Sequence, residues 1–476
     1  MPTEDDSTPP STWRAKVLAR TNDNKLFGAV GESHPCWKLA HECVAGRTPE
    51  KKVEALRGLV EATAVALEPP KVVATGTVAS GRTTLYAPSL DKMMVLPLKQ
   101  MDLKEIIENK ADRAPLGRGA DTVVDLTTRK TWRVGLATND AVVLHDEILK
   151  PIIEEVQRLM RPRGEVVAVP YQLLIYEQGD FFRNHKDTLR GPRHFGSLII
   201  ELPVESGATG GDLIIGNDEA GERVAAPRCN DDNAESGNTA AVAWSAFVTD
   251  LDHKVTPVTS GMRCTLTYQL YDVGPEALPD CPKGGEDLLG ATLAYLGTLD
   301  RNLENAVEVP PKEGYTYGSV RPVVFGYALE HEYSDKTLPI VDTTKIKVPS
   351  RNPARLHGAD LTLYTVLRAA LDRVKSDDAA ALVPRLSVEI GDFRDDSVGR
   401  QNEVEDGVLI ETEHDWRYFL DFGNRITRWL NEDHFRELRR QRTPKNEKID
   451  TGNEGAENGF FYKSAIIRIG NNLEVD

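Results

Sequence analysis

The chain has 476 residues, 40% of them hydrophobic, and a formal net charge of −16. The length favours two or three domains, and the acidic balance argues against nucleic acid as a main partner, because phosphate binding needs a basic face. The five cysteines are scattered and odd in number, without zinc spacing or a disulfide framework, which is typical of a protein from a reducing compartment.

The first segment, residues 1–24, begins with a stretch rich in acidic residues, proline, serine and threonine. It lacks the apolar run of a signal peptide, so we expect a disordered acidic tail. No stretch of the chain approaches 18 consecutive apolar residues, and we therefore expect no membrane-spanning helix and no membrane partner. These observations together predict a cytoplasmic or nuclear protein.

Residues 25–150 form a second segment with mixed periodicity. Apolar spacing and alternation predict short elements here and at its end: helices over 49–67, 101–109 and 148–160, and strands over 71–78, 83–86, 122–124 and 131–134. The last two strands could extend the sheet of the following segment. The pair His145 and Glu147 opens the helix at 148–160, and an acidic first helical turn explains it better than a metal site does.

Residues 151–273 hold the strongest strand patterns of the chain. Alternating or continuous apolar runs predict strands over 166–177, 198–202, 212–215, 241–249 and 263–271. His185 and Asp187 are expected on the segment that leads out of the first of these strands. The polar stretch 216–237 is expected to be a surface excursion, either a lid beside the site or an ordinary loop.

Three side chains of this segment form a candidate metal site. His185 and Asp187 are two residues apart, so in an extended segment their side chains point to the same face. His253 follows the apolar run that begins at Ala241, and it can supply a third ligand from a neighbouring strand. Two histidines and one carboxylate with open positions are typical of non-heme Fe(II) oxygenases.

A second candidate group lies on the last strand of the segment. Arg263, Thr265 and Thr267 alternate with apolar residues and therefore share one face. A guanidinium inside a protein can hold a carboxylate through two parallel hydrogen bonds, and a neighbouring hydroxyl can add another. This arrangement matches what the distal carboxylate of 2-oxoglutarate requires.

These residues carry a resemblance to the Fe(II)- and 2-oxoglutarate-dependent dioxygenases, within them the prolyl 4-hydroxylase-like branch. The matching pattern covers about a hundred residues and runs Tyr176-x-x-Gly179-x-x-Phe182-x-x-His185-x-Asp187, Phe195-Gly196-Ser197-Leu198, Gly210-Gly211-Asp212-Leu213, Trp244-x-Ala246-Phe247-x-x-Asp250-x-x-His253 and Arg263-x-Thr265. Collagen-type members usually have lysine at the anchoring position, whereas this chain has Arg263, as the oxygen-sensing members do. The arginine therefore weakens the expectation of a collagen-like substrate.

The resemblance implies an α+β protein with a double-stranded β-helix (jelly-roll) catalytic core and flanking helices. It implies Fe(II) on His185, Asp187 and His253, and 2-oxoglutarate on Arg263 with help from Tyr176 and Thr265, although Tyr176 could instead be a core tyrosine. O₂ and 2-oxoglutarate would be cosubstrates, and ascorbate is a further candidate cofactor. On this division residues 25–150 flank the barrel, and residues 151–273 form the dioxygenase domain.

Residues 286–476 follow a proline- and glycine-bearing linker at 274–285 and predict a mixed α/β region of unknown role. The expected elements are helices over 287–303, 359–374 and 426–440, and strands over 322–329, 386–390, 407–411 and 460–469, with a turn at 451–458. No second His-x-Asp with a partnered arginine occurs here. The four histidines His331, His357, His414 and His434 lack metal-ligand spacing.

Three functional classes remain open at this stage. The first is a dioxygenase that hydroxylates an unactivated C–H, of a peptidyl proline or of a small molecule, with release of succinate and CO₂. The second is a catalytically weak or inactive barrel that serves as a binding or scaffold protein. The third is a cupin-like iron enzyme that uses no 2-oxo acid.

Overall fold

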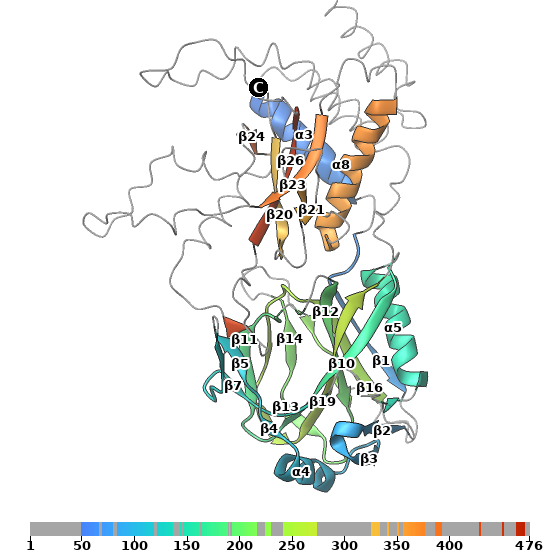
Figure 1. Cartoon of the computed structure of the whole chain (residues 1–476), viewed down its shortest axis with the longest axis vertical. Helices are drawn as coiled ribbons and strands as arrows, with labels where there is room; N and C mark the ends of the chain where they lie inside the picture. The colour runs from blue at the N-terminus through green and yellow to red at the C-terminus, as the bar shows by residue number, and fades with distance from the viewer. Residues whose placement is uncertain are drawn as a thin grey trace, which may run out of the picture.

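The structure is a computed structural model of the whole chain, drawn in Figure 1. The residues it describes are 49–65, 69–79, 83–118, 121–136, 143–144, 146–161, 164–188, 190, 193–216, 224–229, 241–273, 325–333, 340–341, 350–351, 356–376, 386–392, 428–429, 450–451 and 463–471.

The described helices are α3 (Pro49–Val65), η1 (Pro88–Leu90), α4 (Gln100–Asn109), α5 (Asp146–Met160) and α8 (Gly358–Ser376). The strands up to the first site strand are β1 (Val73–Ala79), β2 (Thr84–Ala87), β3 (Lys92–Val95), β4 (Asp112–Arg113), β5 (Leu116–Arg118), β6 (Asp121–Val123), β7 (Arg129–Lys130), β8 (Trp132–Gly135), β9 (Val143–Leu144), β10 (Val166–Tyr176) and β11 (Phe181–His185). The remaining strands are β12 (His194–Leu202), β13 (Ala208–Gly210), β14 (Leu213–Ile215), β15 (Val224–Ala225), β16 (Ala241–Val248), β17 (His253–Val255), β18 (Val258–Gly261), β19 (Arg263–Asp272), β20 (Phe325–Tyr333), β21 (Ile340–Val341), β22 (Ser350–Arg351), β23 (Leu386–Asp392), β24 (Arg428–Trp429), β25 (Asp450–Thr451) and β26 (Lys463–Asn471).

The larger sheet of the lower part has seven strands in the order β1-β16-β12-β19-β10-β8-β4. Its paired strands run antiparallel, with β12 between β16 and β19. All eight residues of β16 are buried, although an antiparallel strand exposed on one face would alternate. The continuous burial follows from cover on both faces, with α5 and its apolar cluster on one side and a second cluster around Phe182, Phe247 and Val255 on the other.

The helix α5 covers this sheet with a single apolar face. Ile148, Ile152, Val156 and Met160 are all buried, and their four-residue spacing places them along one side of the helix. This side packs against β1 and β10. The helix predicted over 148–160 is thus confirmed, with two further residues at its start.

The smaller sheet opposes the larger one and has five strands in the order β15-β14-β17-β11-β7. The chain reaches it from the end of β10 through a turn in which Gly179 has a φ of +82°. Glycine adopts this left-handed conformation without the steric cost of a Cβ atom. His185, expected on the segment that leads out of the first strand, ends the next strand of the chain, β11, which belongs to the opposite sheet.

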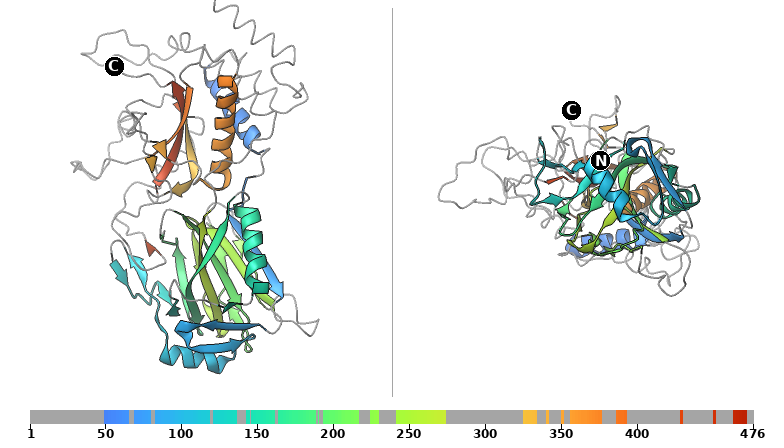
Figure 2. Two further views of the ribbon diagram at one scale, coloured as in Figure 1. Left: turned by 45° about the vertical axis from the view of Figure 1, so that its right-hand side comes forward. Right: turned by 90° about the horizontal axis from the view of Figure 1, so that it is seen from below.

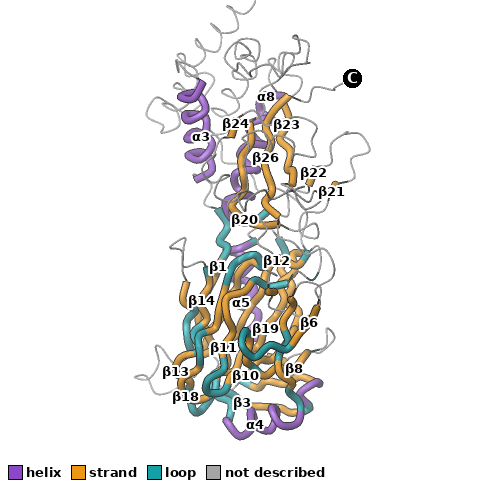
Figure 3. The backbone as a smooth tube through the Cα atoms, turned by 90° about the vertical axis from the view of Figure 1, so that its left-hand side faces the viewer, coloured by secondary structure: helices purple, strands orange, loops and turns teal. Residues whose placement is uncertain are grey.

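A second group of elements lies above the two sheets in Figure 1, and Figure 2 shows the same arrangement from other directions. Its sheet has the order β23-β26-β20-β24, and α8 packs against β20 and β23. The helix α3 comes first among the described elements, yet it packs against α8. Figures 2 and 3 both place it in this upper group. The helix predicted over 359–374 and the strands predicted over 322–329, 386–390 and 460–469 are confirmed within a few residues at their ends.

Two expectations about the sheets need correction. The strand near residues 122–124 forms as β6, but it pairs with β5 in a small sheet of order β25-β5-β6 and does not extend the larger sheet. Within the stretch expected to be a helix over 426–440, Arg428 and Trp429 form β24, which pairs in parallel with β20. Short local patterns do not specify their pairing partner, which the tertiary fold selects.

Several expectations fall on residues outside the described ranges. These are the acidic tail at 1–24, the linker at 274–285, the helix at 287–303, the strand at 407–411 and most of the loop at 216–237. Within the described residues, none of the helices has both the length and the apolar character that crossing a bilayer requires.

Ile200 offers a test of the core of the larger sheet. Its side chain is fully buried on β12 between Trp244 and Leu266 in the strand register. We expect Ile200→Ala to lower the free energy of unfolding by about 2–5 kcal/mol, because the loss of buried methyl groups adds to the cost of the cavity left behind. In urea denaturation, Val167→Ala on the half-exposed face of β10 is the control and should cost less than about 1 kcal/mol.

Candidate metal centre

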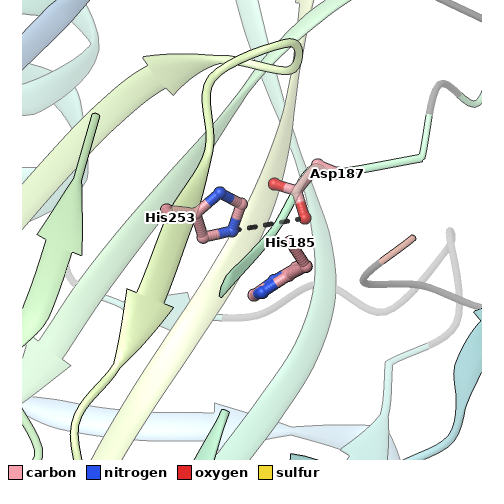
Figure 4. Close-up of side chains that lie close together, drawn as sticks. All are labelled: His185, Asp187 and His253. Carbon is pink, nitrogen blue, oxygen red and sulfur yellow. Dashed lines mark ion pairs between the residues drawn. The ribbon is translucent and has the colours of Figure 1, made fainter. Parts of the chain in front are cut away.

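His185, Asp187 and His253 come together between the two sheets. Their potential ligand atoms all lie within 4.8 Å of one another, and all three residues are buried. Figure 4 shows the two imidazoles and the carboxylate facing one another, with His253 Nε2 and Asp187 Oδ1 3.7 Å apart. The three side chains that the sequence pattern singled out therefore form one cluster.

Strand register explains how the two histidines meet. In the antiparallel pair of β11 and β17, His185 lies directly opposite His253. Residues opposite each other in such a pair have Cα atoms about 4.5–5.5 Å apart, so their side chains on the same face touch. The measured ring centroids are 4.1 Å apart. Asp187 follows two residues after the end of β11 and joins the same face.

Hydrogen bonds fix which imidazole nitrogen faces the cluster. Nδ1 of His185 lies 2.8 Å from the carbonyl oxygen of Arg183, and Nδ1 of His253 lies 3.1 Å from that of Leu251. A carbonyl oxygen only accepts, so each Nδ1 carries the proton, and in a neutral ring Nε2 then has a free lone pair. Burial, followed by the proximity of His253, lowers the pKa of His185 well below 6.5. That ring is therefore neutral and able to bind a metal.

Packed neighbours hold the three groups in place. Phe182 stacks on His185 with ring centroids 3.4 Å apart, and Phe247 lies 4.6 Å from the ring of His253. The hydroxyl of Ser197 on β12 donates a hydrogen bond to Asp187 Oδ2. The aromatic rings limit rotation of the imidazoles, and the hydroxyl orients the carboxylate.

Arg263 begins β19 and is 4% exposed. Its Nε donates to Glu201 Oε2 at 2.8 Å, while Arg228 Nε donates to the other oxygen, Oε1, also at 2.8 Å. The two Nη nitrogens of Arg263 have no hydrogen-bond partner among the described residues. The Nε edge of the guanidinium is thus anchored, while its two Nη nitrogens remain for an external carboxylate. Arg228 also pairs with Asp212 at 2.9 Å, so the connected group of two arginines and two carboxylates has no net formal charge.

Gly211 makes room for this arginine. A Cβ atom on Gly211 would lie 3.1 Å from Arg263 Cδ and 2.8 Å from Val258 Cγ2, and the residue has a φ of +70°. Both the backbone conformation and the contact therefore require glycine here.

The other predicted side chains lie on neighbouring buried positions. Tyr176 is opposite Arg263 in the pairing of β10 with β19, 5.5 Å from ring centroid to guanidinium carbon, and Thr265 is opposite Leu174. Thr267, on the same face as Arg263 and Thr265, has a buried hydroxyl without a hydrogen-bond partner in the described part of the chain. An unpaired buried hydroxyl is rare, and a bound polar ligand would satisfy it.

Two buried side chains near the cluster were not indicated by any sequence pattern. Arg129 on β7 is 2% exposed, with its guanidinium 4.5 Å over the ring of Phe182, the ring that stacks on His185. His194 is 1% exposed, and mainly its burial lowers its pKa to about 4. The only local signal for Arg129 is its position two residues before a predicted strand, which is too common to indicate a role.

Comparison with known proteins finds similarity among solved structures alone. No family model matches the chain, and no curated protein matches it. A prolyl-4-hydroxylase from Pseudomonas putida matches with 15% identity and a TM-score of 0.26, over 46% of this chain and 100% of its own. A prolyl hydroxylase from Trichoplax adhaerens, solved in complex with a hypoxia inducible factor oxygen degradation domain peptide fragment, has 15% identity and a TM-score of 0.26, over 47% of this chain and 92% of its own.

A third match is an oxidoreductase of the 2OG-Fe(II) oxygenase family from Burkholderia pseudomallei, with 11% identity and a TM-score of 0.25, over 46% of this chain and 92% of its own. The chain resembles 2OG-Fe(II) oxygenases.

Proposed function

We propose that this chain is an Fe(II)- and 2-oxoglutarate-dependent dioxygenase. The observation that carries the proposal is the convergence of His185, Asp187 and His253 in one buried cluster. Two imidazole nitrogens and one carboxylate form the ligand set of non-heme Fe(II) oxygenases, with further coordination positions left for small molecules.

The donor chemistry fits a divalent iron ion. Both histidines donate their Nδ1 protons to backbone carbonyls, so Nε2 of each would bind the ion. Asp187 would supply a charged oxygen oriented by Ser197. When bound, iron and 2-oxoglutarate together would supply the O₂-dependent oxidation that hydroxylates a C–H bond and releases succinate and CO₂.

Arg263 would bind the distal carboxylate of 2-oxoglutarate. Its two Nη groups have the parallel geometry that a carboxylate accepts, and Glu201 fixes the guanidinium through Nε. Thr267, whose hydroxyl has no partner among the residues that the structure describes, and the neighbouring Thr265 offer further donors on the same strand face. Tyr176 would contact the cosubstrate from the opposing strand β10. Ascorbate remains a prediction from the resemblance.

We further propose that the seven-stranded and five-stranded sheets are the two sheets of a double-stranded β-helix. Their antiparallel strands enclose the apolar cluster on which the site lies. Residues 151–273 would form its catalytic part, with residues 25–150 flanking it and residues 286–476 forming a separate α+β region. A peptidyl proline is the proposed substrate, and a small molecule is the competing one.

The test uses the purified full chain. Under anaerobic conditions, calorimetric titration should show one Fe(II) or Mn(II) per chain and 2-oxoglutarate binding that depends on the metal. With O₂, Fe(II) and a library of proline-containing peptides or metabolites, succinate should form together with a product one oxygen atom heavier. A chain that binds neither metal nor 2-oxoglutarate would exclude the proposal.

Ser197 provides a finer test of the ligand geometry. Its hydroxyl is the hydrogen-bond donor to Asp187 Oδ2, and loss of such an outer partner typically costs about 10–100-fold in metal affinity. We expect Ser197→Ala to weaken Mn(II) binding by about this factor while 2-oxoglutarate still binds to the metal-loaded protein. Ser206→Ala, at an exposed serine, should leave the Mn(II) affinity unchanged.

A further inference from the structure

A second buried cluster joins the two sheets to the C-terminal elements. Asp250 lies between β16 and β17 and is 6% exposed. Its Oδ2 lies 3.0 Å from Nδ1 of His331 on β20, and its Oδ1 lies 3.0 Å from Nε2 of His357, directly before α8. Each carboxylate oxygen therefore meets a different imidazole.

The charges of this cluster are balanced internally. Burial opposes a charge on His331, but the carboxylate of Asp250 outweighs it and raises the pKa of His331 to about 9. Burial lowers the pKa of His357 to about 4, so this ring is neutral and donates its Nε2 proton. The two imidazoles in turn overcome burial and lower the pKa of Asp250 well below 3.8. One anion and one cation result, and each carboxylate oxygen accepts a hydrogen bond.

The C-terminal side of the cluster is itself held firmly. Asp360 accepts hydrogen bonds from the backbone N–H of His331 and from the hydroxyl of Tyr333, both at 2.9 Å. Gly358 has a φ of +56°, and a Cβ atom there would lie 2.9 Å from His331 Nε2 and 2.7 Å from Val72 Cγ1. The histidines are thus presented on a fixed base that fits tightly against the start of β1.

The turn that carries Asp250 also carries a ligand of the candidate metal centre. His253 follows three residues later, and the carbonyl oxygen of Leu251, next to Asp250, accepts its Nδ1 proton. The turn is fixed at two further points, by Thr249 N–H to the Phe195 carbonyl and by Gly216 N–H to the Asp252 carbonyl. A shift of Asp250 would therefore move the group that orients the imidazole of His253.

We propose that His331 and His357 position the metal ligand His253 by holding Asp250, so that the C-terminal region completes the metal centre. This rests on the proposed function, because it needs a metal at the triad. The histidines touch neither metal nor substrate in this arrangement, and they act as positioning residues through the 249–252 turn.

The experiment compares the full chain with Asp250→Asn, His331→Gln and the double variant. Anaerobic Co(II) titration gives both the affinity and the visible absorption spectrum, which reports coordination geometry. We expect each single variant to bind Co(II) about 10–100-fold more weakly, in the range seen for outer partners of metal ligands. The double variant should lose no more Co(II) affinity than a single variant, because the effects of residues that act through one contact are not additive.

Arg368→Lys is the matched control. Arg368 also lies in the C-terminal region, on α8, where its Nε donates to Asp372 at 3.3 Å in an exposed pair. Its Co(II) affinity and spectrum should remain those of the natural chain. If Asp250→Asn does not fold, His331→Gln, which retains a neutral hydrogen-bonding side chain, carries the comparison, with circular dichroism checking the fold.

The outcomes separate this inference from the proposed function. Natural affinity and spectrum in folded Asp250→Asn or His331→Gln would overturn the positioning role while leaving the triad as the metal site. Two Co(II) ions per natural chain, with one lost in His331→Gln, would also overturn it, because the cluster would then be a second metal site. Absence of Co(II) binding by the natural chain would overturn both the positioning role and the proposed function.

Discussion

Asp187→Ala is expected to abolish metal-dependent turnover. The substitution removes the only carboxylate of the His185, Asp187 and His253 cluster, whose other two members are imidazoles. Loss of an outer partner already costs about 10–100-fold in metal affinity, and loss of a ligand itself costs more. Succinate formation should fall below detection, and Fe(II) or Mn(II) titration should show no saturable site at concentrations that fill the natural chain.

Glu147→Ala is the control for this prediction. Glu147 belongs to the other His-x-acid pair and lies in the first turn of α5, where loss of an acidic residue costs at most about 1 kcal/mol of stability. Its metal affinity and turnover should be those of the natural chain. Asp187→Ala protein that still binds one Fe(II) and forms succinate would contradict the assignment of the triad.

Arg263→Ala is expected to weaken 2-oxoglutarate binding while leaving metal binding intact. Removing one partner of a buried charge pair costs about 3–5 kcal/mol, which corresponds to about two to four orders of magnitude in affinity. The fold should tolerate the change because Arg228 still pairs with Glu201 at 2.8 Å. Calorimetric titration of Mn(II)-loaded protein with 2-oxoglutarate measures the loss directly.

Arg263→Lys serves as the matched comparison because it keeps the positive charge but not the parallel pair of N–H groups. Its affinity should lie between those of the natural chain and Arg263→Ala. An iron enzyme that uses no 2-oxo acid would retain its activity in Arg263→Ala, and a scaffold protein would show no 2-oxoglutarate consumption in any variant.

The sequence was sufficient for the parts of the molecule that depend on local pattern. The four-residue spacing of α5 and the apolar runs of β10, β16 and β19 predicted these elements within a few residues. The His-x-Asp spacing predicted that His185 and Asp187 face the same way. That His253 stands opposite His185 depends on register, which the sequence alone did not specify.

Other parts of the site depend on contacts between distant segments. Glu201 is the only acidic residue of the largely apolar strand β12, which is a usable signal of a buried partner. Its two arginines, however, come from β19 and from the chain after β15. Asp250, His331 and His357 are too far apart in sequence for spacing to group them. Tertiary packing of β20 and α8 brings them together.

The packing of α3 against α8 has a consequence for how the chain is made. α3 precedes every strand of the two lower sheets, and α8 follows all of them. During synthesis α3 leaves the ribosome long before α8 exists, whereas the strands of the two lower sheets are complete earlier. Because domains generally fold as units during translation, the lower sheets should assemble first. Their completion would then bring α3 and α8 close enough to pack against each other.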